Sequence, residues 1–340
     1  MRSPRPTFVL LPAALAAAAI ARPVPARASD GQIEINQTCA TLTGCVPGDT
    51  PGFPILVTQP GSLRLTSDLV VPDENTAAFR VGADDVRIDL AGFTVSGPTV
   101  CSGLPLGCAP TGSGVGVDVD LGDPPERLVV RGGSVRGFGN RGIRTGASAT
   151  LEDLRVMHNG VTGIDAGARS VVRHCEASLN GFMGIAGPSG AVIEESIVSN
   201  NGNVGITVSN SIVERSVISS NGSAGLVLVS GGSAIGNLVS GNRGDGIVTT
   251  VGTANLDGNT TIDNRVFGAP SDEDGVHCNS PCNVRNHVSS GNDGYGLNLF
   301  SGSAYGQSLM SGNALGGVAG GTNAGGNACS GPGVGSASCP

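Results

Sequence analysis

The sequence contains no lysine and no tryptophan, and aromatic residues make up only 3% of its 340 residues. All 19 basic residues are therefore arginine, and 27 acidic residues bring the formal net charge to −8. A field this acidic disfavours nucleic acids and anionic membranes as partners. It also counts weakly against an acidic polysaccharide, unless arginines cluster locally. The scarcity of large aromatic side chains favours a narrow core filled by small and branched residues.

The chain also lacks an apolar stretch long enough to span a membrane. The stretch from Phe8 to Ile20 has 13 residues, which is too short for a transmembrane helix, and two arginines precede it. A small-x-small pattern ends at Ala28, and a second one ends at Ala21. We predict that residues 1–28 are a signal peptide cleaved after Ala28. The product is then exported to the periplasm, the envelope or the medium.

Nine cysteines in an exported chain favour disulfides. Zinc is a competing interpretation for Cys278 and Cys282, which lie beside His277, but no second Cys or His pair has matching spacing. Cys175 is left over, and we expect it to be a small buried core residue. The other eight cysteines form pairs that are close in sequence and predict four local disulfides: Cys39–Cys45, Cys101–Cys108, Cys278–Cys282 and Cys329–Cys339.

A short phrase recurs instead of any helical pattern: Asn, three variable residues, Gly and an aliphatic residue. Its period of 20 to 21 residues over the first five copies is typical of a solenoid, in which each unit is buried only by its neighbours. Asn and Gly enter left-handed conformations at coil corners at low cost, and stacked Asn side chains can hydrogen-bond along a ladder. The copies begin at Asn159, Asn180, Asn201, Asn221, Asn242, Asn292 and Asn313.

The aliphatic residue after each Gly is expected to point inward from a short strand, and such rows stack about 4.8 Å apart. We therefore predict one all-β domain of 10–12 coils over residues 63–325. A Cys-stapled N-terminal cap (29–62) precedes it, and a disulfide-closed tail (326–340) follows it. A Pro/Gly-rich excursion at residues 99–114 interrupts the coils.

The segment VRIDLAGFTVSG (Val86–Gly97) looks like a common first-coil phrase. With the Asn–Gly repeats, it makes the chain resemble right-handed parallel β-helix proteins of the pectate-lyase-like superfamily. The resemblance covers most of the mature chain and implies a single-stranded right-handed solenoid. It does not select an activity, because the superfamily includes lyases, hydrolases, epimerases, adhesins and proteins without known activity.

The solvent-facing residue of each post-Gly strand forms an outward row. Its middle is small or apolar, and we expect Arg144 to form an ion pair with Asp165 between adjacent coils. Aligning the repeats gives the row Arg144, Asp165, Ala186, Thr207, Val227, Val248, His277, Asn298 and Ala319.

A second polar set lies on another face, where charges of both signs stand in register. It is expected to form ion pairs between coils on a soluble surface. Its members are Glu152, Asp153, Arg173, His174, Glu194, Glu195, Glu214 and Arg215.

The period breaks once, between Asn264 and Gly275, where 11 residues replace the usual spacing of 4. The insertion ends in three acidic residues, and one coil later Tyr295 should stack over Asp274 and Asn298 over His277. Functional residues are often carried by such loops on rigid solenoids.

Three interpretations of this patch remain open. Asp272, Glu273 and Asp274 would bind Ca²⁺ through oxygen ligands. His277 and Tyr295, with Asn298 beside them, would transfer protons on a uronic acid sugar. The third interpretation is a solvated acidic loop held by the Cys278–Cys282 disulfide.

Several enzyme signatures are missing. The chain has no Asp-Pro-His run like that of alginate epimerases, no Gly-His-Gly like that of polygalacturonases, and no lysine to act as the base of a lyase. We therefore predict an exported, non-enzymatic carbohydrate-binding or structural surface module. The alternative is a polysaccharide lyase or C5-epimerase acting on uronic-acid polymers through His277 and Tyr295. Polysaccharide is the partner expected in either case, and calcium is the one cofactor considered.

Overall fold

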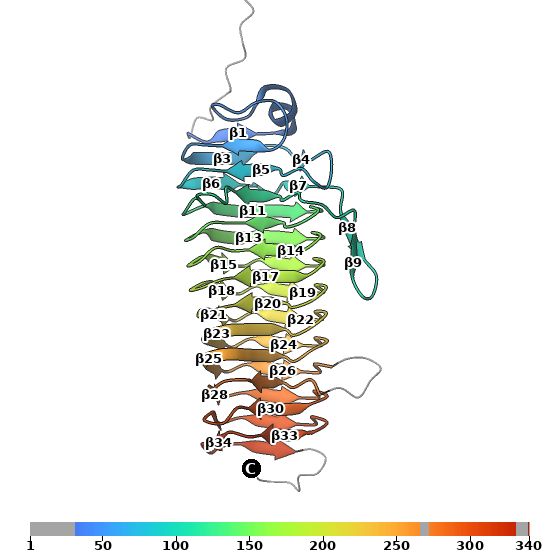
Figure 1. Cartoon of the computed structure of the whole chain (residues 1–340), viewed down its shortest axis with the longest axis vertical. Coiled ribbons are helices and arrows are strands. Elements are labelled where there is room, and N and C mark those ends of the chain that lie inside the picture. The colour runs from blue at the N-terminus through green and yellow to red at the C-terminus, as the bar shows by residue number, and fades with distance from the viewer. Residues whose placement is uncertain (1–30, 266–271, 331–338, 340) are drawn as a thin grey trace, which may run out of the picture.

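The computed structural model describes residues 31–265, 272–330 and 339, so the predicted signal peptide and its cleavage at Ala28 lie outside the described residues. The chain winds into an elongated all-β solenoid of about 13 turns with almost no helix (Figure 1). This confirms the all-β solenoid predicted from the Asn–Gly period and the parallel β-helix that the resemblance implied. The turns slightly outnumber the 10–12 expected.

The turns stack three parallel sheets, which we call sheets I, II and III. Sheet I carries the post-Gly strands: β2 (Ile55–Val57), β5 (Phe79–Val81), β10 (Val117–Val119), β12 (Ile143–Arg144), β14 (Thr162–Asp165), β17 (Met183–Gly187), β20 (Ile206–Val208), β23 (Leu226–Ile235), β25 (Ile247–Asp257), β27 (Val276–Cys278), β30 (Tyr295–Leu299) and β33 (Gly316–Ala319).

Sheet II follows within each turn, and the long strands β23 and β25 continue into it from sheet I. Its other members are β1 (Ile33–Ile35), β3 (Gly61–Leu65), β6 (Val86–Asp89), β11 (Val129–Arg136), β13 (Thr150–Met157), β15 (Val171–Arg173), β18 (Val192–Glu194), β21 (Ser211–Glu214), β28 (Cys282–Arg285), β31 (Ala304–Gly306) and β34 (Thr322–Asn323).

Sheet III completes each turn and leads to the Asn corner, and β11 and β13 reach it from sheet II. Its other members are β4 (Leu69–Val70), β7 (Thr94–Ser96), β16 (Glu176–Ser178), β19 (Ile197–Ser199), β22 (Val217–Ser219), β24 (Leu238–Ser240), β26 (Thr260–Ile262), β29 (Val288–Ser290), β32 (Leu309–Ser311) and β35 (Ala328–Ser330).

The core is a stack of aliphatic rows. The residue after each repeat Gly points inward and pairs with its counterpart one turn on, as in Ile164 with Ile185 and Ile206 with Leu226. These four side chains have no exposed surface. The predicted inward row is therefore confirmed, and it fixes which residues of sheet I face solvent.

An asparagine ladder closes one corner of the coils. After the first member, each Asn side-chain oxygen accepts hydrogen bonds from the backbone and side chain of the preceding Asn, as Asn201 does from Asn180 at 3.1 and 3.0 Å. Because these amides are buried, the ladder pairs groups that would otherwise lack partners. The ladder runs through Asn159, Asn180, Asn201, Asn221, Asn242, Asn264, Asn292 and Asn313.

A second buried ladder contains the unpaired cysteine. The backbone N–H of Cys175 donates to Ser196 Oγ, and that of Ser196 donates to Ser216 Oγ. Among the described residues Cys175 is the free cysteine; it is buried, and burial raises its pKa to about 12. The thiol is therefore a core group and not a reactive one.

All four predicted disulfides are present. Cys101–Cys108 joins β8 (Val100–Ser102) to β9 (Gly107–Ala109), an antiparallel hairpin that projects from the solenoid (Figure 1). Cys278–Cys282 links β27 to β28, so this pair forms a disulfide and not the zinc site considered from sequence.

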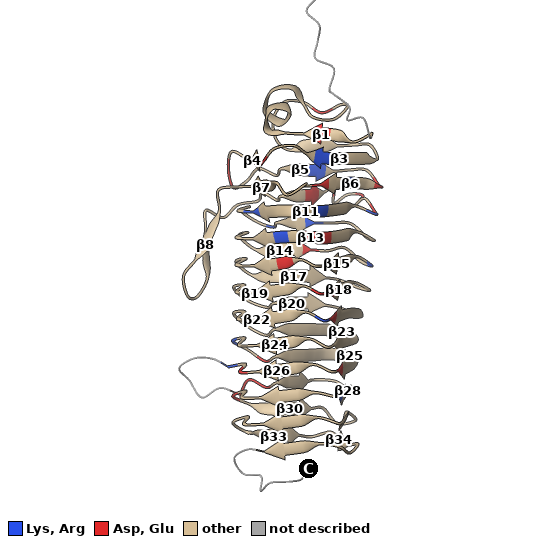
Figure 2. Ribbon diagram, turned by 180° about the vertical axis from the view of Figure 1, so that it is seen from behind, with Lys and Arg blue, Asp and Glu red and all other residues tan. Residues whose placement is uncertain are grey.

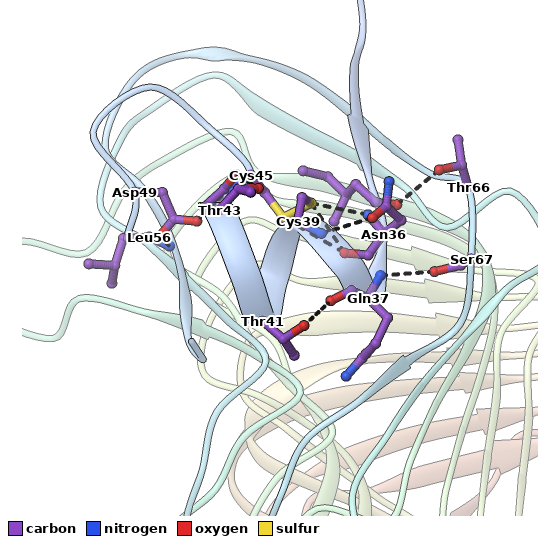
Figure 3. Close-up of a disulfide and its surroundings, with 12 residues drawn as sticks. Asn36, Gln37, Cys39, Thr41, Thr43, Cys45, Asp49, Leu56, Thr66 and Ser67 are labelled. Atoms are coloured by element: carbon purple, nitrogen blue, oxygen red, sulfur yellow. Dashed lines mark hydrogen bonds between the residues drawn. A yellow bond between two sulfur atoms is a disulfide. The ribbon is translucent and has the colours of Figure 1, made fainter. Parts of the chain in front are cut away.

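The N-terminal end is covered by the short π-helical segment η1 (Cys39–Thr43), stapled by Cys39–Cys45 (Figure 3). The Asp49 carboxylate accepts the N–H of Cys45 at 2.9 Å and that of Leu56 at 3.1 Å, which ties this cap to β2. The strands β1 and β2 lie within residues 33–57, and each pairs in parallel with a strand of a later coil, β1 with β3 and β2 with β5. In the described part of the chain, no helix is long and apolar enough to cross a membrane.

Candidate functional site

The outward row of sheet I carries polar residues toward both ends and small or apolar residues in the middle. Its register is as predicted from Arg144 to Ala319, and it extends upstream to Asp118 and Arg80. Figure 2 shows basic and acidic residues alternating along the N-terminal half of this face and an uncharged stretch beyond β14. The row is thus a long face with ionisable side chains in two groups, one toward its N-terminal end and one toward its C-terminal end.

The N-terminal group centres on a buried carboxylate. Asp118 is 4% exposed, and its Oδ1 accepts hydrogen bonds from Nε and Nη2 of Arg144 at 2.8 and 2.6 Å. Arg80 lies 3.6 Å from its other oxygen. Arg144 was expected to pair with Asp165, and this is wrong, because Asp165 pairs with Arg141 at 2.8 Å. Asp118 is the more buried acceptor and takes the guanidinium in two contacts.

The C-terminal group brings together Asp245, Asp274 and His277. Nδ1 of His277 lies 3.0 Å from Oδ2 of Asp274 and 3.7 Å from Oδ2 of Asp245. Asp274 is 1% exposed, whereas the imidazole is one-third exposed on the outer row. The arrangement holds an accessible imidazole against two carboxylates, one of which is fully enclosed.

Asp274 is fixed by donors from the next coil. Its Oδ1 accepts the N–H of Tyr295 at 2.6 Å, and its Oδ2 accepts Nδ2 of Asn298 at 2.8 Å. A Cβ at Gly294 would lie 2.4 Å from Oδ1 of Asp274, so only glycine allows this close approach. The predicted stacking of Tyr295 on Asp274 and of Asn298 on His277 is confirmed.

The cluster perturbs two titratable groups. The hydrogen bond to Asp274 raises the pKa of His277 above its usual value, although partial burial opposes this. Burial raises the pKa of Asp245 to about 6, and the neighbouring carboxylate of Asp274 adds to this, while the N–H of Asp274, 2.6 Å from Asp245 Oδ1, opposes it. Two close carboxylates thus face one imidazole and favour its protonated form.

Of the three acids considered for calcium, only Asp274 belongs to this cluster. Asp272 is exposed, and Glu273 lies beside the cluster with one buried oxygen, Oε2, that has no hydrogen-bond partner among the described residues. Sequence reasoning missed Asp245. The signal was present: Asp245 and Asp274 both precede the repeat Gly, so they occupy the same place in consecutive coils.

The second ring nitrogen of His277, Nε2, faces a hydrogen-bonding group and not a carboxylate. Nε2 of His277 lies 3.2 Å from Oδ1 of Asn279 at an exposed position. A carboxylate that binds one imidazole nitrogen orients the ring and stabilises its protonated form. The Asp274–His277 pair is therefore suited to hold a proton, and its ligand atoms are also suited to a metal ion.

The second predicted polar set forms ion pairs between coils along sheet II, as expected. Arg173 binds Glu152, and Arg215 binds Glu194 and Glu195 at 3.1 and 3.0 Å. The arginines are about half exposed, so each such pair contributes little to stability. This face needs no functional explanation.

The comparisons with known proteins agree on the fold. The family model for the right-handed β-helix region matches residues 129–267. No curated protein sequence matches the chain.

Solved structures that are similar to this one include two epimerase modules and a tailspike protein. The A-modules of the mannuronan C-5 epimerases AlgE4 and AlgE6 of Azotobacter vinelandii are each 14% identical, with TM-scores of 0.59 and 0.54. The AlgE4 match covers 87% of this chain and 86% of the other; the AlgE6 match covers 88% of each. The Dettilon tailspike protein gp208 has a TM-score of 0.52 at 14% identity, covering 80% of this chain and 59% of the other. The chain therefore has the right-handed parallel β-helix fold that its resemblance to known β-helix proteins implied.

Proposed function

We propose that the protein is an exported, non-enzymatic module that binds a polysaccharide along the outward row of sheet I. The observation that carries this proposal is the row itself, whose residues stand in register over consecutive coils. Between its polar ends the row consists of Ala186, Thr207, Val227 and Val248, which are small enough to leave a flat strip.

The chemistry of this strip suits a sugar polymer. The apolar faces of pyranose rings pack on small aliphatic residues, while hydroxyl and carboxyl groups need the polar ends. Arg80, Arg141 and Arg144 cluster at one end, and their ion pairs with Asp118 and Asp165 leave one net positive charge there. The fold is shared with epimerases of mannuronan, which supports carbohydrate as the partner class. The disulfides support export.

Affinity electrophoresis against polyuronates and neutral glycans tests the proposal. Val227→Arg places a bulky charge in the middle of the strip and should abolish retardation in the gel. Val217→Arg is the matched control, because Val217 also faces solvent but lies on sheet III. Equal retardation of both variants, or no retardation of the wild type by any glycan, would refute the proposal.

One observation favours a second candidate, a lyase or C5-epimerase of uronic-acid polymers. It is the 3.0 Å contact of His277 with Asp274, beside Tyr295 and Asn298. An oriented imidazole is a general base or acid in reach of a sugar on the row.

Incubation with a polyuronate panel, with and without EDTA, separates the two candidates. Absorbance from unsaturated products reports a lyase, and proton NMR of the polymer reports an epimerase. Activity that disappears in His277→Ala but persists in His174→Ala would replace the binding proposal with the enzymatic one.

A further inference from the structure

The two carboxylates near His277 approach the same ring nitrogen. Asp274 and Asp245 lie 3.0 and 3.7 Å from Nδ1, and one ligand atom from each of the three residues lies within 4.8 Å of the others. Two adjacent carboxylates on a low-dielectric sheet repel each other, so a cation between them is favoured. Either a proton on the imidazole or a metal ion supplies that charge.

The spacing fits a metal ion with short bonds. Ligand atoms bound to one Zn²⁺ at about 2.0–2.1 Å in tetrahedral geometry lie roughly 3.3 Å apart. The distances of 3.0 and 3.7 Å bracket this value. Three protein ligands with one further position are also the usual composition of an open zinc site.

A separate observation also favours a cation at this place. Oε2 of Glu273 is buried and has no hydrogen-bond partner among the described residues. Glu273 directly precedes Asp274 in the chain, so it adjoins the cluster. A buried carboxylate oxygen without a partner is costly, and a nearby cation would reduce that cost.

His174 shows what an ordinary ion-paired histidine looks like in this fold. It also has two carboxylate neighbours, but Asp153 lies 3.5 Å from Nδ1 whereas Glu195 lies 2.7 Å from Nε2. The acids stand on opposite sides of the ring, so no single ion could contact all three groups. Convergence on one nitrogen is what sets His277 apart.

We propose that Asp245, Asp274 and His277 form a binding site for a divalent transition metal of the Zn²⁺ type. The ligands are Nδ1 of His277 and one carboxylate oxygen from each aspartate, with the remaining position open on the outward face of sheet I. Imidazole favours Zn²⁺, Cu²⁺ or Ni²⁺ over Ca²⁺, which prefers an all-oxygen set. The site thus differs in composition and metal class from a calcium loop at residues 272–274.

The metal links this cluster to the outward row. Its open position faces the same side as the strip of small residues, where a sugar carboxylate or hydroxyl would complete the coordination. This last step rests on the proposed glycan binding, whereas metal binding itself does not.

Calorimetric titration of the chelator-treated, disulfide-intact protein with ZnCl₂ alone tests the site. We expect one Zn²⁺ per chain and little heat from CaCl₂. Asp245→Asn and His277→Ala should each weaken Zn²⁺ binding at least about tenfold, while His174→Ala should leave it unchanged. Asp245→Asn retains an oxygen for the N–H of Asp274 and carries the test if circular dichroism shows that His277→Ala is unfolded.

Two further readouts separate this site from a plain ion pair. Zn²⁺ affinity should fall as the pH is lowered, because protons compete for Nδ1 and the carboxylates. Co²⁺ should give the visible absorption of a low-coordinate N/O site, which is absent in His277→Ala. No stoichiometric Zn²⁺, or equal affinity in Asp245→Asn, would overturn the inference. Gel retardation measured without metal reports the glycan proposal independently.

Discussion

Replacing Asn201 by alanine should destabilise the solenoid strongly, because this residue connects three coils. Its side-chain oxygen accepts the backbone and side-chain N–H groups of Asn180, and its Nδ2 donates to the carbonyl of Ala177 at 3.0 Å and to Oδ1 of Asn221 at 2.9 Å. The side chain is 2% exposed. Alanine removes all four contacts and leaves their partners inside the corner.

The magnitude follows from the groups left without a partner. Oδ1 of Asn221 keeps the backbone N–H of residue 201, so it remains satisfied. Nδ2 of Asn180 likewise keeps the carbonyl of Val156 at 3.2 Å. The backbone N–H of Asn180 and the carbonyl of Ala177 each lose the hydrogen bond to Asn201, at about 1–3 kcal/mol per buried group. The expected loss lies between roughly 2 and 6 kcal/mol, and we expect the lower half because water enters the vacated space.

Urea unfolding followed by far-UV circular dichroism measures the loss as a change in midpoint at constant slope. Asn203→Ala is the matched control, since Asn203 lies at the same corner, is half-buried, and is held by its backbone N–H to Phe182. It should change the free energy of unfolding by less than about 0.5 kcal/mol. A loss below about 1 kcal/mol for Asn201→Ala would show that the ladder does not stabilise the coils.

Two further predictions concern the charged groups of sheet I. Asp245→Asn should stabilise the protein more near pH 7 than near pH 4. Because burial raises the folded pKa of Asp245 to about 6 from an ordinary 3.8, the wild type loses up to about 3 kcal/mol of stability as this carboxyl ionises. A difference in thermal midpoint that does not depend on pH would contradict this. Arg144→Ala should lower the free energy of unfolding in urea by about 3 kcal/mol, because it removes the main partner of the enclosed Asp118 carboxylate. Arg155→Ala breaks an exposed ion pair and should lower it by less than about 1 kcal/mol. Similar losses in the two variants would refute the argument.

The parts of the fold that could be predicted are those set by local period. A fixed spacing of Asn and Gly determines where each corner falls, and once the corners are aligned the inward and outward residues of sheet I follow. For that reason the stacking of Tyr295 and Asn298 on the preceding coil could be predicted from the sequence. The disulfides could also be predicted, because each joins cysteines at most 10 residues apart in the sequence.

The contacts that escaped prediction cross an irregular turn. Asp118 lies 26 residues before Arg144, outside the regular spacing, so the period could not align the two. Asp245 lies 29 residues before Asp274 because the seven-residue insertion separates them. Composition directed attention to the acidic run at residues 272–274, but the fold selects partners by coil position and not by proximity in sequence.

The second buried ladder also explains the position of His287. Ser196, Ser216, Asn237 and Asn259 hold the equivalent positions in earlier coils, and the N–H of His287 continues the pattern by donating to the next coil. Its ring, however, turns toward Thr261, with Nε2 3.0 Å from Oγ1. A fully buried imidazole thus replaces a small polar side chain.

His287 should make the protein sensitive to acid. Burial lowers its pKa to about 3 from an ordinary 6.5, so the folded state holds the ring neutral while the unfolded chain binds a proton below pH 6.5. The resulting stability is complete above that pH and is lost as the pH falls toward 3. His287→Asn, which restores the residue type of Asn259, removes this linkage and should gain about 3 kcal/mol over the wild type near pH 4 relative to pH 8. Urea midpoints at the two pH values measure the gain, and an equal difference at both would mean that the buried ring does not control acid unfolding.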